Sequence, residues 1–121
     1  MTSTPSPAPH LSEAAKLNQQ IGQLHKAGKY SEALPYASRL LELCEKTLGP
    51  EHPDTATSLN NLALLYRSMG DYAKAEPLYE RALKIYEKAL GPDHPDTAQS
   101  LNNLAELYRS MGDYAKAEPF L

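Results

Sequence analysis

Apolar residues recur every three or four positions through the middle of the chain, which is the spacing of one side of an α-helix. A first apolar series begins at Leu59, and a second runs from Tyr72 to Leu90. Between them, Gly70 can adopt the left-handed backbone that closes a helix, and Asp71 can cap the next helix. The stretch therefore predicts two antiparallel helices joined by a tight turn.

This pattern occurs three times along the chain. Residues 49–79 and 91–121 are related by a shift of 42 positions and differ at only five of them. The differences are Glu51/Asp93, Thr57/Gln99, Leu64/Glu106, Leu78/Phe120 and Tyr79/Leu121. A more divergent copy in the same register occupies residues 13–48. A period of this length is typical of stacked helical hairpins, which cannot bury their apolar faces alone.

We therefore expect an all-α fold, a right-handed superhelical array of antiparallel hairpins that forms one domain over residues 11–121. In the first hairpin we expect Gly28 at the turn and Ser12 as an N-cap. Residues 1–10 are rich in Pro, Ser and Thr, so we expect a disordered leader there. The three predicted repeats, the last of them truncated, are at about residues 11–48, 53–90 and 95–121.

Composition narrows the possible partners. The net charge of −3 and the pI near 5.8 give no basic field, so we expect no nucleic-acid partner. No apolar run is long enough to cross a bilayer, and residues 1–10 do not resemble a signal peptide, so we expect a cytoplasmic protein. The single cysteine, Cys44, is expected to be a reduced, partly buried apolar residue.

Two His-Pro-Asp segments are the nearest approach to a metal or catalytic motif. Each segment, beginning at His52 or His94, offers one imidazole and one carboxylate, whereas a metal site needs three or four converging ligands. A capping role at the start of a helix is the better interpretation, because Pro53 suits a first helical position and Asp54 suits the positive end of the helix dipole. We expect no cofactor and no enzymatic activity, since no nucleophile, base or phosphate-binding loop is recognisable.

A binding groove is expected instead, because stacked hairpins leave a concave face that is lined mainly by their first helices. Opposite the core stripe, these helices carry a row of asparagines, a cationic row and one variable row. An asparagine amide can hold a peptide backbone of any sequence, and a guanidinium recognises carboxylates. The alternative for the asparagines is an interhelical hydrogen bond, which we favour for Asn61 and Asn103. The candidate peptide-binding residues are Asn18, His25, Asn60, Leu64, Arg67, Asn102, Glu106 and Arg109.

The repeat resembles the tetratricopeptide repeat. The segment Leu59-x2-Leu62-Ala63-x2-Tyr66 and the later Ala75-x3-Tyr79 follow the pattern of that family. The 42-residue period and the GPEHPDTA connector are similar to the repeats of kinesin light chains. The resemblance implies a protein-interaction scaffold whose groove binds an extended acidic peptide, with Leu64 as an apolar contact.

A structural role in self-assembly is the alternative function. The last copy ends early in its second helix, so its apolar side could be covered by a second molecule. The residues predicted to drive such a homo-oligomer are Leu104, Tyr108, Phe120 and Leu121.

Overall fold

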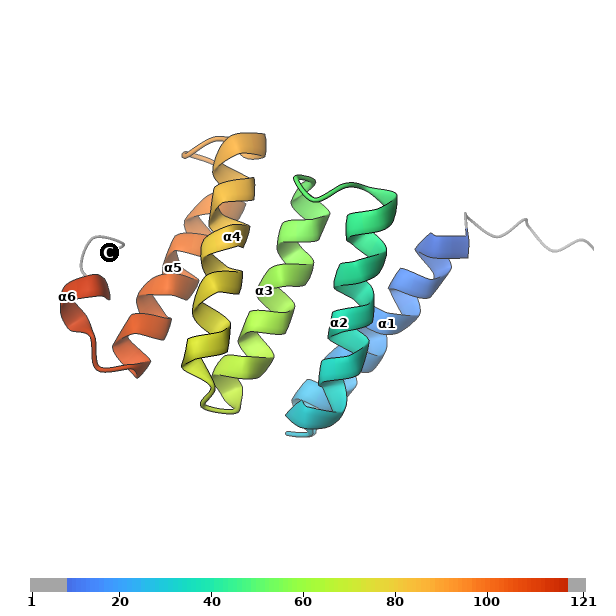
Figure 1. The fold of residues 1–121 in the computed structure, drawn as a ribbon, viewed down its shortest axis with the longest axis horizontal. Helices are drawn as coiled ribbons and strands as arrows, with labels where there is room; N and C mark the ends of the chain where they lie inside the picture. Colours follow the sequence, from blue (N-terminus) through green and yellow to red (C-terminus); the bar gives the residue numbers. More distant parts are fainter. Residues whose placement is uncertain (1–8, 118–121) are drawn as a thin grey trace, which may run out of the picture.

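The computed structural model describes residues 9–117, which contain α-helices and no strand (Figure 1). Each helix packs against its neighbour in the chain, so the predicted all-α array of hairpins is confirmed. The helices are α1 (Pro9–Lys26), α2 (Tyr30–Thr47), α3 (Pro53–Ser68), α4 (Tyr72–Leu90), α5 (Pro95–Ser110) and α6 (Tyr114–Ala117).

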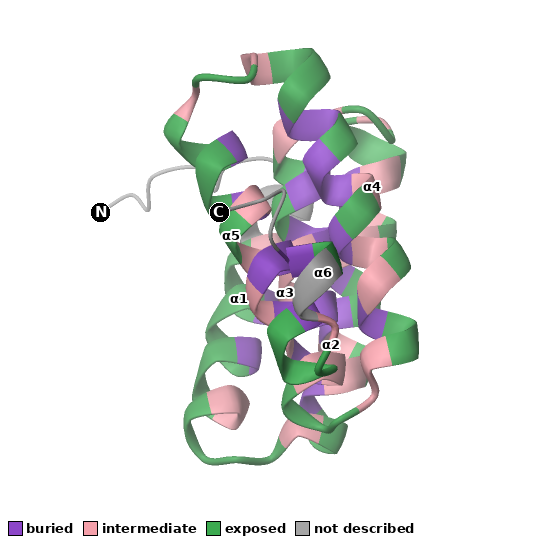
Figure 2. Ribbon diagram, turned by 90° about the vertical axis from the view of Figure 1, so that its left-hand side faces the viewer, coloured by how far each residue is buried: buried purple, intermediate pink, exposed green. Residues whose placement is uncertain are grey.

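The array has two layers. The first helices α1, α3 and α5 lie on one side, and the second helices α2 and α4 lie on the other (Figures 1 and 2). Buried residues are concentrated between the layers, while the outer faces are largely exposed (Figure 2). Small residues permit the close approach of the layers, because Ala33, Ala63, Ala75 and Ala82 are fully buried.

Glycines end the first helices at the hairpin turns, as the pattern predicts. Gly70 has a φ of 80°, a conformation that strains any residue with a Cβ. The backbone N–H of Gly70 donates to the carbonyl of Arg67, and that of Asp71 donates to the carbonyl of Tyr66 at 2.8 Å. This is the Schellman arrangement, and it satisfies carbonyls that the end of α3 would otherwise leave without a partner.

Three details of the expected hairpins are different in the structure. Helix α1 begins at Pro9, so Pro9 and His10 belong to a helix, and Ser12 lies inside α1 and not at its N-cap. Asp71 precedes α4 but makes no side-chain capping hydrogen bond; its carboxylate lies 3.7 Å from the ammonium of Lys74 instead. The leader prediction for residues 1–8 lies outside the described residues.

Two of the four residues predicted to drive self-association are buried in the structure. Leu104 and Tyr108 are 1% and 4% exposed, because they pack inside the chain against Ala63, Tyr79 and Ala117. Both side chains are therefore core residues, and neither forms part of a surface. Phe120 and Leu121 lie outside the described residues.

Candidate functional site

Two hollows lie between successive first helices and follow one another along the array. The α3–α5 hollow, of about 300 Å³, is bounded by Asn60 and Leu64 of α3 and by Gln99 and Asn103 of α5. Tyr79 and Tyr86, both buried residues of α4, line the same hollow. The site is therefore a recess rich in amide and hydroxyl groups with two tyrosine rings.

The α1–α3 hollow lies between the preceding pair of first helices and measures about 220 Å³. Ile21, Leu64 and Leu65 form its apolar wall. His25 and Asn61 supply polar groups, and Gly22 leaves open space where α3 carries Leu64. Leu64 borders both hollows, so it separates two neighbouring compartments of one continuous face.

A chain of hydrogen bonds organises the α3–α5 hollow. The Thr57 hydroxyl donates to the Pro53 carbonyl at 3.2 Å and lies 2.6 Å from the hydroxyl of Tyr86. Burial raises the pKa of Tyr86; hydrogen bonds from Thr57 and Asn60 oppose the rise, and the Asp96 carboxylate adds to it. Tyr86 therefore stays protonated at neutral pH and connects α4 to α3.

The expected cationic row is interrupted by an internal ion pair. Arg67 lies 3.9 Å from Glu106 of the next first helix, so this guanidinium already has a carboxylate partner. Arg67 also approaches Tyr79, whose pKa is raised by burial and lowered in part by Arg67. In the first copy, His25 packs against the ring of Tyr30, with 5.3 Å between the ring centroids. Arg109 is exposed, so it is the member of the row that is open to a ligand.

The asparagines are arranged differently from the prediction. Asn18 and Asn60 are at the hollows, as expected, whereas Asn102 is exposed on α5. Asn61 and Asn103, for which we favoured an interhelical role, also line the hollows, so both rows face the groove. The repeated Asn-Asn pair was the available signal, since each hollow takes amide side chains from both of its first helices. The sequence did not identify Tyr79, Tyr86 and Asp96 as lining residues, because they occupy core and capping positions in the pattern.

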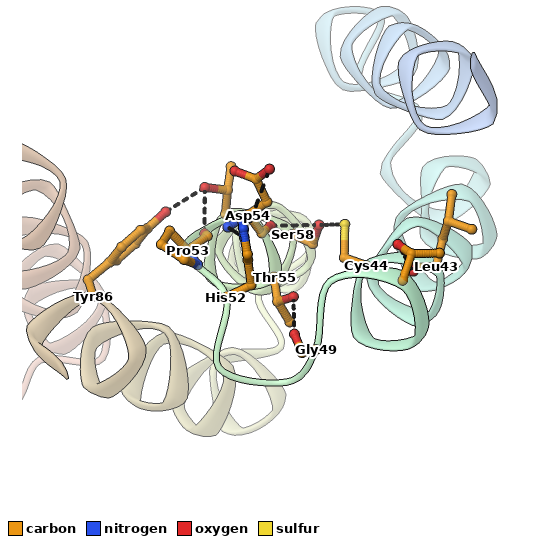
Figure 3. Close-up of polar contacts among 11 residues, drawn as sticks. Leu43, Cys44, Gly49, His52, Pro53, Asp54, Thr55, Ser58 and Tyr86 are labelled. Carbon is orange, nitrogen blue, oxygen red and sulfur yellow. Dashed lines mark hydrogen bonds and ion pairs between the residues drawn. The ribbon is translucent and has the colours of Figure 1, made fainter. Parts of the chain in front are cut away.

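The connectors have structural roles. His52 and His94 are the N-caps of α3 and α5, and each Nδ1 accepts a hydrogen bond of 3.0 Å from the backbone N–H two residues later. The capping interpretation is thus confirmed. Thr55, which is fully buried, donates its hydroxyl proton to the Gly49 carbonyl at 2.7 Å (Figure 3). Within residues 9–117, no three His, Cys, Asp or Glu side chains converge in an arrangement that could hold a metal ion.

Cys44 is a buried core residue, as predicted. Its Sγ lies 3.3 Å from the Oγ of Ser58, and this contact links α2 to α3 (Figure 3). Cys44 also borders a hollow of about 260 Å³ beside the first connector. In the described part of the chain, no helix combines the length and the apolar character needed to span a bilayer.

Comparison with known proteins gives one family. The family model described as Tetratricopeptide repeat matches residues 12–88 and again residues 60–121. A comparison with curated proteins gives no match.

Solved structures of similar proteins agree with this result. BtubC (BKLC) from P. vanneervenii is 31% identical, with a TM-score of 0.81 over 89% of this chain and 43% of its own. A Podosopora anserina protein, named for kinesin light chain and carrying nearly identical TPR-like repeats, is 27% identical, with a TM-score of 0.82 over 93% and 53% of the two chains. The TPR domain of Arabidopsis FLU shares the fold at 18% identity, with a TM-score of 0.80 over 93% and 91%. The chain thus spans about half the length of the first two of these structures.

Proposed function

Because the chain belongs to the tetratricopeptide-repeat family, in its kinesin-light-chain-like form, we propose that it binds an extended, acidic peptide along the face formed by α1, α3 and α5. Proteins of this family generally mediate protein–protein interactions and typically act as scaffolds without chemistry of their own. The peptide, its direction and its acidic character belong to the proposal.

The observation that carries the proposal is the repetition of the hollows. Each takes asparagines from both of its first helices: Asn18 and Asn61 line the first hollow, and Asn60, Asn61 and Asn103 line the second. A primary amide carries both donors and acceptors, so successive pairs can hydrogen-bond to the backbone of an extended peptide at intervals of one repeat. Such contacts supply affinity for a peptide of almost any sequence.

The acidic preference rests on charges at the C-terminal ends of the first helices. Lys26 and Arg109 are exposed there, and Arg67 is held by Glu106 at a distance of 3.9 Å. A pair of this length between partly exposed groups is weak, so a peptide carboxylate can replace Glu106 as the partner of Arg67. Glu106 would then lower the affinity for acidic peptides without abolishing it.

The test is fluorescence polarisation of short labelled peptides that vary in acidic and aromatic content, at low and high salt. We expect acidic peptides to bind more tightly and to lose affinity as salt increases. Asn61→Ala should weaken all of the peptides by about fivefold, because one hydrogen bond to the ligand is lost. Gln19→Ala, at the exposed first-copy counterpart of Asn61, is the matched control.

A second variant addresses the charge. Glu106→Leu places in the third copy the residue that the second copy has, and it frees Arg67. We expect acidic peptides to bind about threefold more tightly to this variant. Equal binding of acidic and neutral peptides, unaffected by salt, would refute the acidic preference. If no peptide binds, the proposed peptide-binding groove is refuted.

A further inference from the structure

We propose that the α3–α5 hollow receives a lysine or arginine side chain of the bound peptide. This inference rests on the proposed function and specifies one position of the ligand. It predicts a peptide of mixed charge, with a cationic side chain near the start of α5 and acidic side chains near the ends of the first helices. The two regions are well separated, since the 13 positions between Asp96 and Arg109 span about 20 Å of helix.

One acceptor in the wall of this hollow has no partner. The hydroxyls of Thr57 and Tyr86 lie 2.6 Å apart and share a hydrogen bond in which either oxygen can be the donor. The Oδ1 of Asn60, which lines the same hollow, is buried and has no hydrogen-bond partner in the described part of the chain.

A carboxylate lies on the rim of the same hollow. Asp96 belongs to the lining, and its charge acts on the Tyr86 hydroxyl. The nearest basic group to this carboxylate is His94, whose Nδ1 is 4.0 Å away. That nitrogen accepts a hydrogen bond from the Asp96 backbone, so it carries no proton that could be shared with the carboxylate. In residues 9–117, no lysine or arginine forms an ion pair with Asp96.

The hollow therefore has an exposed carboxylate on its rim that no lysine or arginine of the described residues pairs with. It also has in its wall a carbonyl oxygen that an incoming group reaches when the Asn60 side chain turns toward it. An ammonium or guanidinium carries several donors and no acceptor, so it suits both. Leu64 and the ring of Tyr79 provide apolar surface for the methylene stem of such a side chain. A carboxylate ligand would face two acceptors and no free cation at this position.

The equivalent place one repeat earlier is the hollow of about 260 Å³ beside Cys44, whose lining includes Asn18, Asp54, Thr57 and Asn61. There Cys44 replaces Tyr86, and the exposed Asn18 replaces the half-buried Asn60. Asp54 keeps the position of Asp96, so this hollow has the carboxylate without the tyrosine hydroxyl or the unpartnered amide oxygen. The chain thus contains an internal control for the proposed site.

The experiment is an NMR titration of the isotope-labelled chain with three short peptides that differ only at one central residue: lysine, norleucine or glutamate. We expect the lysine peptide to bind about tenfold more tightly than the norleucine peptide at low salt. It should also shift the side-chain amide signals of Asn60, Gln99 and Asn103. Asp96→Asn should abolish the preference for lysine, while Asp54→Asn should preserve it, although both variants remove a carboxylate from the start of a helix.

The outcomes separate the two proposals. If the norleucine or glutamate peptide binds the α3–α5 hollow as tightly as the lysine peptide, this inference is overturned and the peptide-binding groove stands. If Asp54→Asn removes the preference as completely as Asp96→Asn, the effect is general helix-end charge, and the inference is again overturned. If no peptide shifts signals of α1, α3 or α5, the proposed function fails. If Asp96→Asn does not fold, the three peptides are compared on the unmodified chain at low and high salt. The inference predicts that the preference for lysine decreases as salt increases, and a preference that does not change with salt overturns it.

Discussion

The first and second hairpins have the same backbone arrangement, but one row of side chains on their first helices differs in polarity and burial. In α3, the row that packs against α2 is buried, and in α5 the equivalent row is buried in the same way. In α1, the same row is polar and largely exposed. By position, Glu13, Lys16, Gln20 and Gln23 of α1 correspond to Thr55, Ser58, Leu62 and Leu65 of α3.

This difference shows which positions depend on a neighbouring repeat and which belong to the hairpin itself. Leu17, Ala33 and Ala37 are buried within the first hairpin, as their counterparts are in the second. The polar row of α1 resembles the outer face of a terminal repeat, which must remain compatible with water. Stacking another repeat of the α3 type on α1 would bury the polar side chains of Lys16, Gln20 and Gln23, and it would also cover Glu13, which pairs with Arg39 at 2.8 Å.

Exchanging residues between the α1 and α3 rows should give the largest change in the free energy of unfolding. Leu65→Gln converts α3 to the α1 pattern at a position that is 1% exposed, and we expect a loss of about 3 kcal/mol in the free energy of unfolding. The reverse change, Gln23→Leu, lies on an exposed face and should alter stability by less than about 0.5 kcal/mol. Urea unfolding followed by circular dichroism measures both. Similar losses in the two variants would contradict the difference between the α1 and α3 rows.

Two glycines give a second and smaller contrast. Gly70 has a positive φ at the turn, so Gly70→Ala should destabilise the chain by about 1–2 kcal/mol even though the added Cβ meets no atom within 4 Å. Gly22 lies inside α1 with the same open space, so Gly22→Ala should stabilise the chain by about 0.5–1 kcal/mol. Thermal unfolding distinguishes the two, and effects of the same sign would show that space and not backbone conformation controls these sites.

The contacts of α3 and α5 with the preceding second helix differ in the hydrogen bond of a tyrosine. Tyr108 of α5 donates to Glu76 of α4 at 2.9 Å, whereas the corresponding pair one repeat earlier is Tyr66 and Leu34. Tyr108→Phe should cost about 1 kcal/mol. Tyr66→Phe is the matched control and should cost less.

This contact also predicts a dependence on alkaline pH. Burial, followed by the hydrogen bond to Glu76, raises the pKa of Tyr108 above its ordinary value of 10.0. Its contribution to stability is therefore complete below pH 10 and decreases as the pH rises beyond that value, because the unfolded chain loses the proton more readily. Tyr108→Phe should reduce the fall in stability between neutral and alkaline pH. If the stability of Tyr108→Phe falls with pH as much as that of the unmodified chain, the pH dependence comes from Tyr79 and Tyr86 instead. Burial also raises the pKa values of these two residues.

Much of the fold could be predicted because its signals are local. Gly28, Gly70 and the Pro53 segment each specify the end or the start of a helix through backbone geometry alone. The candidate site was predicted less completely. The sequence placed Asn60 and Leu64 on the groove face, but it could not show that Glu106 approaches Arg67 or that Asn61 faces a hollow. Both results depend on how far one hairpin is rotated and shifted against the next.

The sequence by itself determined the family, the hairpin architecture and the identity of the first helices as the groove face, since periodicity and turn chemistry repeat with every copy. Only the tertiary structure decided which polar groups of that face remain available to a ligand. Arg67 is engaged by Glu106, whereas Asn60 and Asp96 line one recess with Tyr86, and Asp96 has no lysine or arginine partner in the described residues. The physical reason is that hydrogen bonds and ion pairs form over distances of a few ångströms. The side chains that meet across two helices are therefore set by the packing of neighbouring repeats.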